Sequence, residues 1–413
     1  MKKTLLTICL VWMCFSLSAQ KIIDLSGKWS FSIDRQDNGE KEKWFSHTLN
    51  DFINLPGSMP EKLKGDEVTA KTQWTGSLYD SSYYYNPYME KYRKEGNIKF
   101  PFFLTPDKHY VGAAWYQKEV NIPADWKGER ILLFLERPHI ETTVWVNGQK
   151  TGMQNSLCVP HQYDITRYVR PGKCTITIRV DNRIKEINVG PDSHSITDQT
   201  QGNWNGIVGR ICLQTTPKTY FDDIQIYPEP EQKLARVKVV IKGTGTAKVK
   251  LSAESFNTDK KHIVPAIQQE IKLNKGVTET EMVLPMGNDM LLWDEFHPAL
   301  YKLKAEVTNG KKTEIKEIQF GMRRFEIKGK WFYVNGRKTQ LRGTVENCDF
   351  PLTGYAPMDV ESWERVFRIC RSYGLNHMRF HSFCPPEAAF IAADRVGFYL
   401  QPEGPSWPNH GPK

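Results

Sequence analysis

The chain has 413 residues, of which 39% are hydrophobic and 25% are charged, a composition typical of globular proteins with room for roughly two to four domains. Its formal net charge is +9 at pH 7, but Lys and Arg are scattered rather than clustered, so we expect no nucleic-acid partner. Aromatic residues make up 12% of the chain, and Trp and Tyr, with flat apolar faces and a polar edge, suit either sugar binding or core packing.

The first residues have the pattern of an export signal. Lys2 and Lys3 give a positive start, residues 5–17 are apolar, and residues 18–20 (SAQ) offer a cleavage site after Ala19. This apolar run is too short to span a bilayer comfortably, and no later stretch is long and apolar enough. We therefore expect an exported protein, periplasmic or extracellular, with a signal peptide over residues 1–19 and no membrane span.

The cysteines do not follow a metal-binding pattern. Two of the 8 lie in the signal, and the spacing of the others matches no zinc motif of paired cysteines. An exported protein can form disulfides, but about fifteen pairings of six cysteines are open. We expect most of them to be buried as small hydrophobic side chains. They are Cys158, Cys174, Cys212, Cys348, Cys370 and Cys384.

Short strand-like runs broken by Gly, Pro, Asn and Asp fill the region from Ile22 to Thr216. Asn147-Gly148 between two such runs is a strong hairpin signal. Residues 175–180 alternate between polar and apolar side chains with the period of a β-strand. These patterns predict a jelly-roll β-sandwich, which we assign to residues 20–217.

A second β-domain follows directly. Strand-like runs recur at regular spacing from Tyr220 to Gln319, and a domain of about 100 residues with this spacing is typical of an immunoglobulin-like β-sandwich. We assign it to residues 218–321. The chain is thus expected to be multidomain, with two sandwiches before its last part.

The last part, residues 322–413, changes to a strand and helix pattern. A strand from Leu341 precedes a helical pattern over residues 358–373, a second strand (HMRF), a helical pattern over residues 387–395 and a strand over residues 398–401. Such alternation predicts parallel βα units. A full (β/α)8 barrel takes about 250 residues, so we expect an incomplete TIM barrel of about three strands.

Several segments resemble family 2 glycoside hydrolases. WYQKEVNIPADWKGERILLFLERPHIETTVWVNGQKTG, YDITRYVRPGKCTITIRVDNR and WNGIVGRICLQTTP resemble the sugar-binding domain of that family. LLWDEFHPALYKLKAEV resembles its immunoglobulin-like domain, and FGMRRFEIKGKWFYVNGRKTQLRG looks like its entry into the barrel. The family includes β-galactosidases, β-glucuronidases and β-mannosidases. The resemblance implies a retaining exo-β-glycosidase acting on oligo- or polysaccharides in carbohydrate breakdown.

The resemblance also implies where the two catalytic carboxylates belong. In the family, the acid/base is the Glu of an Asn-Glu pair after barrel strand 4, and the nucleophile is a Glu after strand 7. Here the last expected strand is the third strand of the barrel. The pair Glu346-Asn347 has the two residues in the opposite order and follows the first strand. We therefore expect both glutamates beyond Lys413, so that this chain is a fragment, inactive alone, whose barrel a second chain could complete. The alternative is a non-catalytic exported carbohydrate-binding protein.

Four residues near the expected strand ends are candidates for substrate binding. Arg379 and His381 match a place where family members read Arg-x-Ser-His, with the histidine displaced by one. Glu403 matches a Glu that helps to hold magnesium in the β-galactosidase branch. The neighbouring Asp of that branch is absent here, which weakens the expectation of Mg²⁺ at Glu403. We expect no other cofactor. Asn347 falls where a β-galactosidase-like sequence has His.

The loop HSITDQTQGNWNG, residues 194–206, is dense in polar groups. In the family the matching stretch can reach the mouth of the barrel. Asp198, Asn203 and Trp204 are then expected to help form the sugar subsite. The alternative is a surface loop packed against the second domain. By contrast, Glu387 and Asp394 are expected on a helix face in solvent, without a functional role.

Overall fold

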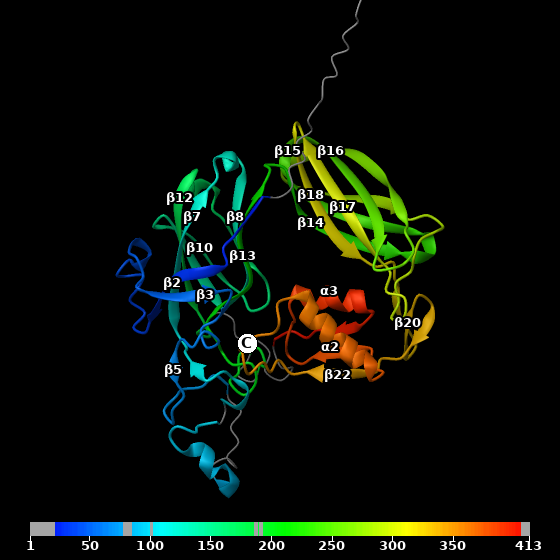
Figure 1. Cartoon of the computed structure of the whole chain (residues 1–413). Coiled ribbons are helices and arrows are strands. Elements are labelled where there is room, and N and C mark those ends of the chain that lie inside the picture. The colour runs from blue at the N-terminus through cyan, green and yellow to red at the C-terminus, as the bar shows by residue number, and fades with distance from the viewer. Residues whose placement is uncertain (1–20, 77–84, 100–101, 186–188, 190–192, 406–413) are drawn as a thin grey trace, which may run out of the picture.

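The computed structural model describes residues 21–76, 85–99, 102–185, 189 and 193–405. The predicted signal segment lies outside these residues. Two β-sandwiches lie side by side, and a small unit of helices and parallel strands lies below the second sandwich and beside the first (Figure 1). Within the described ranges, no helix combines the length and the apolar character needed to cross a membrane.

The first sandwich consists of two antiparallel sheets. One has the strand order β1-β13-β8-β11, with β4 paired to β13, and the other has the order β10-β9-β12-β7-β2-β3. The large apolar side chains between the sheets, including Trp29, Phe31 and Tyr116, are almost fully buried. The strands are β1 (Ile22–Asp24), β2 (Gly27–Asp34), β3 (Asp51–Leu55), β4 (Gly57–Ser58), β7 (Ala113–Ile122), β8 (Arg130–His139), β9 (Glu141–Val146), β10 (Gln149–Asn155), β11 (His161–Asp164), β12 (Gly172–Asp181) and β13 (Gly206–Thr216).

The predicted hairpin at Asn147-Gly148 is confirmed. It joins β9 to β10, and both residues have positive φ, 50° and 76°, as a tight turn that matches the strand twist requires. The side chain of Asn147 also accepts a hydrogen bond from the Thr175 amide at 2.9 Å, so the turn is fixed to β12 as well.

The second half of β12 is buried on both faces. Thr177 and Arg179, the polar residues of its alternating stretch, are buried. An aromatic cluster covers this side of the sheet, in which Trp115 and Trp145 stack at 5.0 Å and the loop residue Phe45 stacks on Trp145 at 5.1 Å. Period-two alternation cannot reveal such a cover, because the covering loop is far away in sequence.

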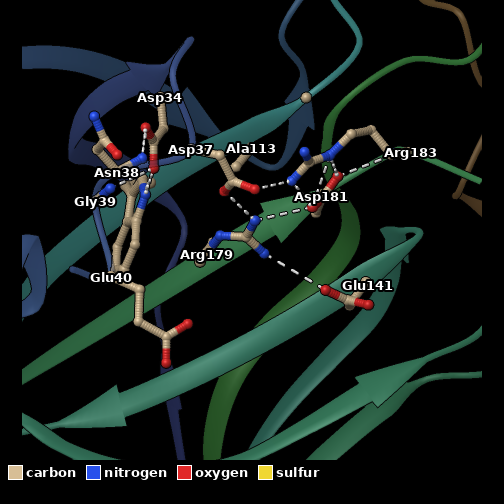
Figure 2. A network of polar contacts seen from close by, with 12 residues as sticks. Asp34, Asp37, Asn38, Gly39, Glu40, Ala113, Glu141, Arg179, Asp181 and Arg183 are labelled. Atoms are coloured by element: carbon tan, nitrogen blue, oxygen red, sulfur yellow. Dashed lines mark hydrogen bonds and ion pairs between the residues drawn. The ribbon is translucent and has the colours of Figure 1, made fainter. Parts of the chain in front are cut away.

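Burying Arg179 requires partners, and a network of carboxylates supplies them (Figure 2). The guanidinium lies 2.6 Å from Asp37 and 2.9 Å from Asp181. Arg183 contacts the same two carboxylates, each at 2.6 Å. Burial alone would raise the pKa of Asp181, but hydrogen bonds from Arg183 and Lys185 outweigh it and hold the pKa well below 3.8. The network fastens the loop that carries Asp37 to the end of β12.

A long excursion separates β4 from β7. It contains a two-stranded ribbon of β5 (Asp66–Glu67) and β6 (Lys108–His109). Tyr85 and Tyr88 at its far end are 82% and 83% exposed. The 3-10 helices of the chain are η1 (Trp44–Ser46), η2 (Pro87–Arg93), η3 (Phe102–Leu104), η4 (Ala124–Trp126), η5 (Thr166–Tyr168) and η6 (Pro230–Gln232).

The second sandwich is built around one long strand. The first half of β15 pairs with β14 and its second half with β17, while β16 follows it along most of its length. Register shifts at Gly243/Gly245 and Leu251/Ala253 bend β15, as β-bulges do, so it contributes to both sides of the core. The strands are β14 (Tyr220–Glu229), β15 (Leu234–Phe256), β16 (Ile263–Pro285), β17 (Leu300–Asn309) and β18 (Lys312–Phe320).

The third unit confirms the predicted order of strands and helices. An antiparallel meander comes first, followed by a parallel sheet of order β22-β23-β24 whose connections are α2 and α3. Three parallel strands do not close a cylinder, so the incomplete TIM barrel stays a prediction. The elements are β19 (Phe325–Lys328), β20 (Trp331–Val334), β21 (Arg337–Thr339), β22 (Gly343–Glu346), α2 (Val360–Ser372), β23 (His377–Phe380), α3 (Glu387–Val396) and β24 (Tyr399–Gln401).

The third unit packs on both sandwiches, and this corrects the expectation that Asp394 faces solvent. Trp293 of the second sandwich is 2% exposed and donates its Nε1 proton to the Asp394 carbonyl at 2.7 Å. The Asp394 carboxylate pairs with Arg323 at 3.1 Å. Glu387, which is more exposed, pairs with Arg210 of the first sandwich at 2.9 Å. The Asp394 carboxylate therefore holds α3 in place, whereas Glu387 is exposed to solvent, as expected, and makes only an exposed ion pair.

The end of α3 allows a test of this packing. Gly397 terminates the helix with φ 77°, and a Cβ there would lie 2.7 Å from the Glu295 carbonyl oxygen of the second sandwich. We predict that Gly397→Ala lowers the free energy of unfolding by about 1 to 3 kcal/mol and makes residues 322–405 the first to be cut by protease. Thermal unfolding and timed proteolysis measure both effects.

Gly374 is the matched control, because it follows α2 with φ 81° and a Cβ there would meet nothing within 4 Å. Gly374→Ala carries the same backbone cost without the steric clash. Equal losses of stability in the two variants would contradict the packing described.

Candidate functional site

Parallel strands bring their carboxyl ends to one edge of a sheet, and in α/β proteins this edge is where ligands bind. β22, β23 and β24 end at Glu346, Phe380 and Gln401 in this unit. The polar residues that follow these ends therefore converge. These polar residues form the candidate site.

Arg379 and Glu403 form the most rigid pair of this edge. The Arg379 Nε donates to one carboxylate oxygen of Glu403 at 2.5 Å, and the Ser382 amide donates to the other at 2.9 Å. Burial alone would raise the pKa of Glu403, but these two hydrogen bonds outweigh it and lower the pKa below 4.5. Glu403 is therefore an anion at neutral pH with both oxygens engaged.

His381 and Asn347 lie beside this pair. The Nδ1 of His381 is 3.3 Å from the Asn347 side-chain oxygen, and Asn347 is exposed. The structure thus brings all four residues predicted near the strand ends to one edge. Their roles in substrate binding stay predictions, but the arrangement offers fixed hydrogen-bond donors and acceptors of the kind that orient sugar hydroxyls.

The first sandwich contributes a fifth residue that the sequence analysis missed. The His194 ring meets the His381 ring edge to face, with centroids 4.2 Å apart. Burial lowers the pKa of His194 to about 4, and the neighbouring His381 adds to this shift. His194 is therefore neutral at pH 7. It opens the loop that was predicted to approach this site, but nothing in its own sequence context marked it.

Glu346, at the end of β22, was also missed as a site residue. Burial raises its pKa above 4.5, and a hydrogen bond from the Cys348 amide at 2.9 Å offsets only part of this. The edge therefore carries two carboxyl groups with opposite shifts, because Glu403 is paired with a cation and Glu346 is not. Opposite shifts of this kind are common where acid and base roles are divided.

The predicted subsite residues Asp198, Asn203 and Trp204 are 1%, 3% and 3% exposed. Asp198 accepts hydrogen bonds from the Thr75 amide at 2.7 Å, and Asn203 contacts His139 at 3.1 Å. These contacts fix the loop to the first sandwich. In this arrangement no face of the three side chains is open to a sugar, and their part in a subsite stays a prediction.

Other residues of the same loop reach the strand ends. The Ser195 hydroxyl donates to the Ser382 carbonyl at 2.9 Å, and the Gln201 side-chain oxygen accepts from the Cys348 thiol at 2.9 Å. Trp204 lies near Tyr355, which follows β22. The loop therefore packs against the third unit, whereas the alternative expectation placed it against the second domain.

Magnesium does not fit the residues present. The two Glu403 oxygens are already engaged by Arg379 and Ser382. Among the residues that the structure describes, no group of three or more His, Cys, Asp or Glu side chains is arranged to hold a metal ion. We therefore assign no step of the proposed reaction to Mg²⁺ at Glu403.

Family models match most of the chain. Residues 22–217 match the sugar binding domain of glycosyl hydrolases family 2, and residues 219–323 match a second model of the same family. Together these matches cover more than two thirds of the chain, including both sandwiches.

Individual relatives agree with the family models. The chain is 24% identical over 334 residues to a beta-galactosidase of Thermoanaerobacter pseudethanolicus, with 76% of this chain and 42% of the relative covered. It is 23% identical over 407 residues to a beta-glucuronidase of Paenibacillus borealis, with 94% and 59% covered. The crystal structure of Ruminococcus gnavus beta-glucuronidase superposes with a TM-score of 0.68 at 20% identity, covering 94% of this chain and 59% of that one. The chain thus spans about half the length of these relatives.

The Arg379–Glu403 pair allows a direct test of the site. We predict that Arg379→Gln raises the pKa of Glu403, because the cation that lowers it is removed while its burial remains. Carboxyl ¹³C NMR titration measures this pKa, with Glu403→Gln to assign the signal.

The control is Arg324→Gln, which removes an exposed arginine paired with Glu326 on β19. It should leave the Glu403 titration unchanged. A Glu403 signal that titrates identically in wild type and Arg379→Gln would mean that the pair is not formed in solution.

Proposed function

The chain belongs to glycosyl hydrolase family 2, and we propose that it is the N-terminal part of an exported, retaining exo-β-glycosidase that removes a terminal β-linked sugar. The observation that carries this proposal is the order of its parts. A sugar-binding sandwich and a second family 2 domain precede parallel strands, and the polar ends of those strands meet a loop of the first sandwich.

In this proposal the described residues form one wall of the sugar site. Arg379 and Glu403 form a rigid pair, and His381 with Asn347 presents an imidazole and an amide beside it. Neutral His194 closes the wall from the first sandwich. Preorganised groups of this kind lower the entropic cost of placing a sugar ring correctly.

The reaction itself needs two further carboxyl groups. Retaining hydrolysis uses a nucleophile and an acid/base about 5 Å apart. We infer that both are supplied from outside residues 1–413, either by a continuation of the polypeptide or by a second chain. The relatives named above are a beta-galactosidase and a beta-glucuronidase, which makes β-galactosides and β-glucuronides the first substrates to test.

The proposal is tested with nitrophenyl glycosides. The isolated chain should release no nitrophenol from β-glucuronide, β-galactoside, β-mannoside or the matching α-glycosides. The chain together with the polypeptide encoded directly downstream should hydrolyse one of the β-glycosides, and ¹H NMR of the first product should show retention of the β-anomer.

Turnover by the isolated chain would overturn the assignment of the catalytic carboxylates. Inversion, or hydrolysis of an α-glycoside, would contradict the proposed mechanism. Sugar binding without turnover under either condition would favour a non-catalytic carbohydrate-binding protein instead.

A further inference from the structure

Two cysteines from distant parts of the chain meet next to the candidate site. Cys158 lies between β10 and β11 of the first sandwich, and Cys384 lies between β23 and α3. Both are free thiols and both are partly buried. The two thiols are close enough for each to influence the ionisation of the other. Sequence spacing alone cannot pair any of the six cysteines.

The backbones around the two thiols are held together independently of the sulfur atoms. The guanidinium of Arg137, on β8, donates to the Cys384 carbonyl at 3.0 and 3.1 Å and to the Cys158 carbonyl at 3.3 Å. The rigid fork of an arginine therefore fixes both peptide units side by side. Ser195 holds the Ser382 carbonyl two residues before Cys384, which restrains this loop further.

The ionisation of the two thiols is coupled. The hydrogen bond from Cys158 and the positive charge of Arg137 lower the pKa of Cys384 below its ordinary value of 9.0, although burial opposes them. Donation of that hydrogen bond and burial raise the pKa of Cys158. The thiolate is the reactive form of cysteine, and we take Cys384 as the attacking thiol.

We propose that Cys158 and Cys384 are a redox-active pair that forms a disulfide between the first sandwich and the loop after β23. The oxidant is an external disulfide, such as oxidised glutathione. The Cys384 thiolate attacks one of its sulfurs and expels one thiolate, which leaves a mixed disulfide on Cys384. Cys158 then loses its proton, attacks the Cys384 sulfur and expels the second thiol. Two protein thiols are oxidised by two electrons, and the external disulfide is reduced to two thiols.

The bond would fix the wall of the candidate site. Cys384 follows His381 and Ser382 closely, and Ser382 donates its amide proton to Glu403. A covalent link at this point holds the strand ends against the first sandwich. It closes a long loop of the chain, and such links restrict the unfolded state most. The expected effect is a Tm higher by roughly 5 °C or more in the oxidised chain.

Peptide mapping tests the proposal on the full chain. The chain is incubated with a glutathione buffer rich in the oxidised form, its free thiols are blocked, and it is digested without reductant. The expected result is a peptide pair joined through Cys158 and Cys384, with two fewer free thiols than in the reduced chain. Three outcomes would each overturn the proposal. They are a peptide pair joined through Cys348 and Cys158, glutathione left on Cys384, and six thiols still free at residues 158–384.

Thermal unfolding gives a second readout. The rise in Tm on oxidation should disappear in Cys158→Ser and in Cys384→Ser and persist in Cys370→Ser, which removes a partly buried thiol of α2. A rise that survives in either of the first two variants would contradict the pair. If these variants do not fold, the mapping of the unmodified chain decides alone.

Discussion

The arrangement of the molecule depends on how the carbonyl groups after β23 are satisfied. Buried backbone carbonyls need donors, and in the loop at residues 382–385 the Phe383 carbonyl accepts from the Glu403 amide of the same unit. The other three carbonyls have donors in the first sandwich. The first sandwich supplies them through Ser195 and Arg137, which donate to the carbonyls of Ser382, Cys384 and Pro385. These hydrogen bonds fix the orientation of the parallel sheet relative to the first sandwich. The strand ends therefore face the loop that begins near His194.

The second sandwich holds the opposite side of the same unit. Trp293 and Arg323 contact the C-terminal half of α3, and the helix ends against Glu295. With both sides held, the edge of β22, β23 and β24 is supported by two rigid bodies. This packing supports three parallel strands that have only two helices, and it gives the candidate site residues a fixed geometry.

Local structure was largely predictable from the sequence. The Asn147-Gly148 turn and the strand and helix order of residues 341–401 all follow from short-range chemistry, and the structure confirms them. Four site residues were identified through resemblance, and the parallel topology brings them together. The sequence could not show which surfaces meet across domains. Three features depend on contacts between segments far apart in the chain, which leave no periodic signal in the sequence. They are the position of His194 at the site, the burial of Arg179 and the contacts of Asp394.

Amide hydrogen exchange at residues 381–384 tests most directly whether the first sandwich fixes the strand ends. Among these, the His381 and Ser382 amides should exchange slowly in the wild-type chain, because they donate to Glu346 and Glu403 within a held loop. Arg137→Gln should speed their exchange by about tenfold or more, while Arg35→Gln, which removes an exposed ion pair of the first sandwich, should not. Exchange at the rate of a free peptide in wild type, or equal protection in wild type and Arg137→Gln, would contradict the account.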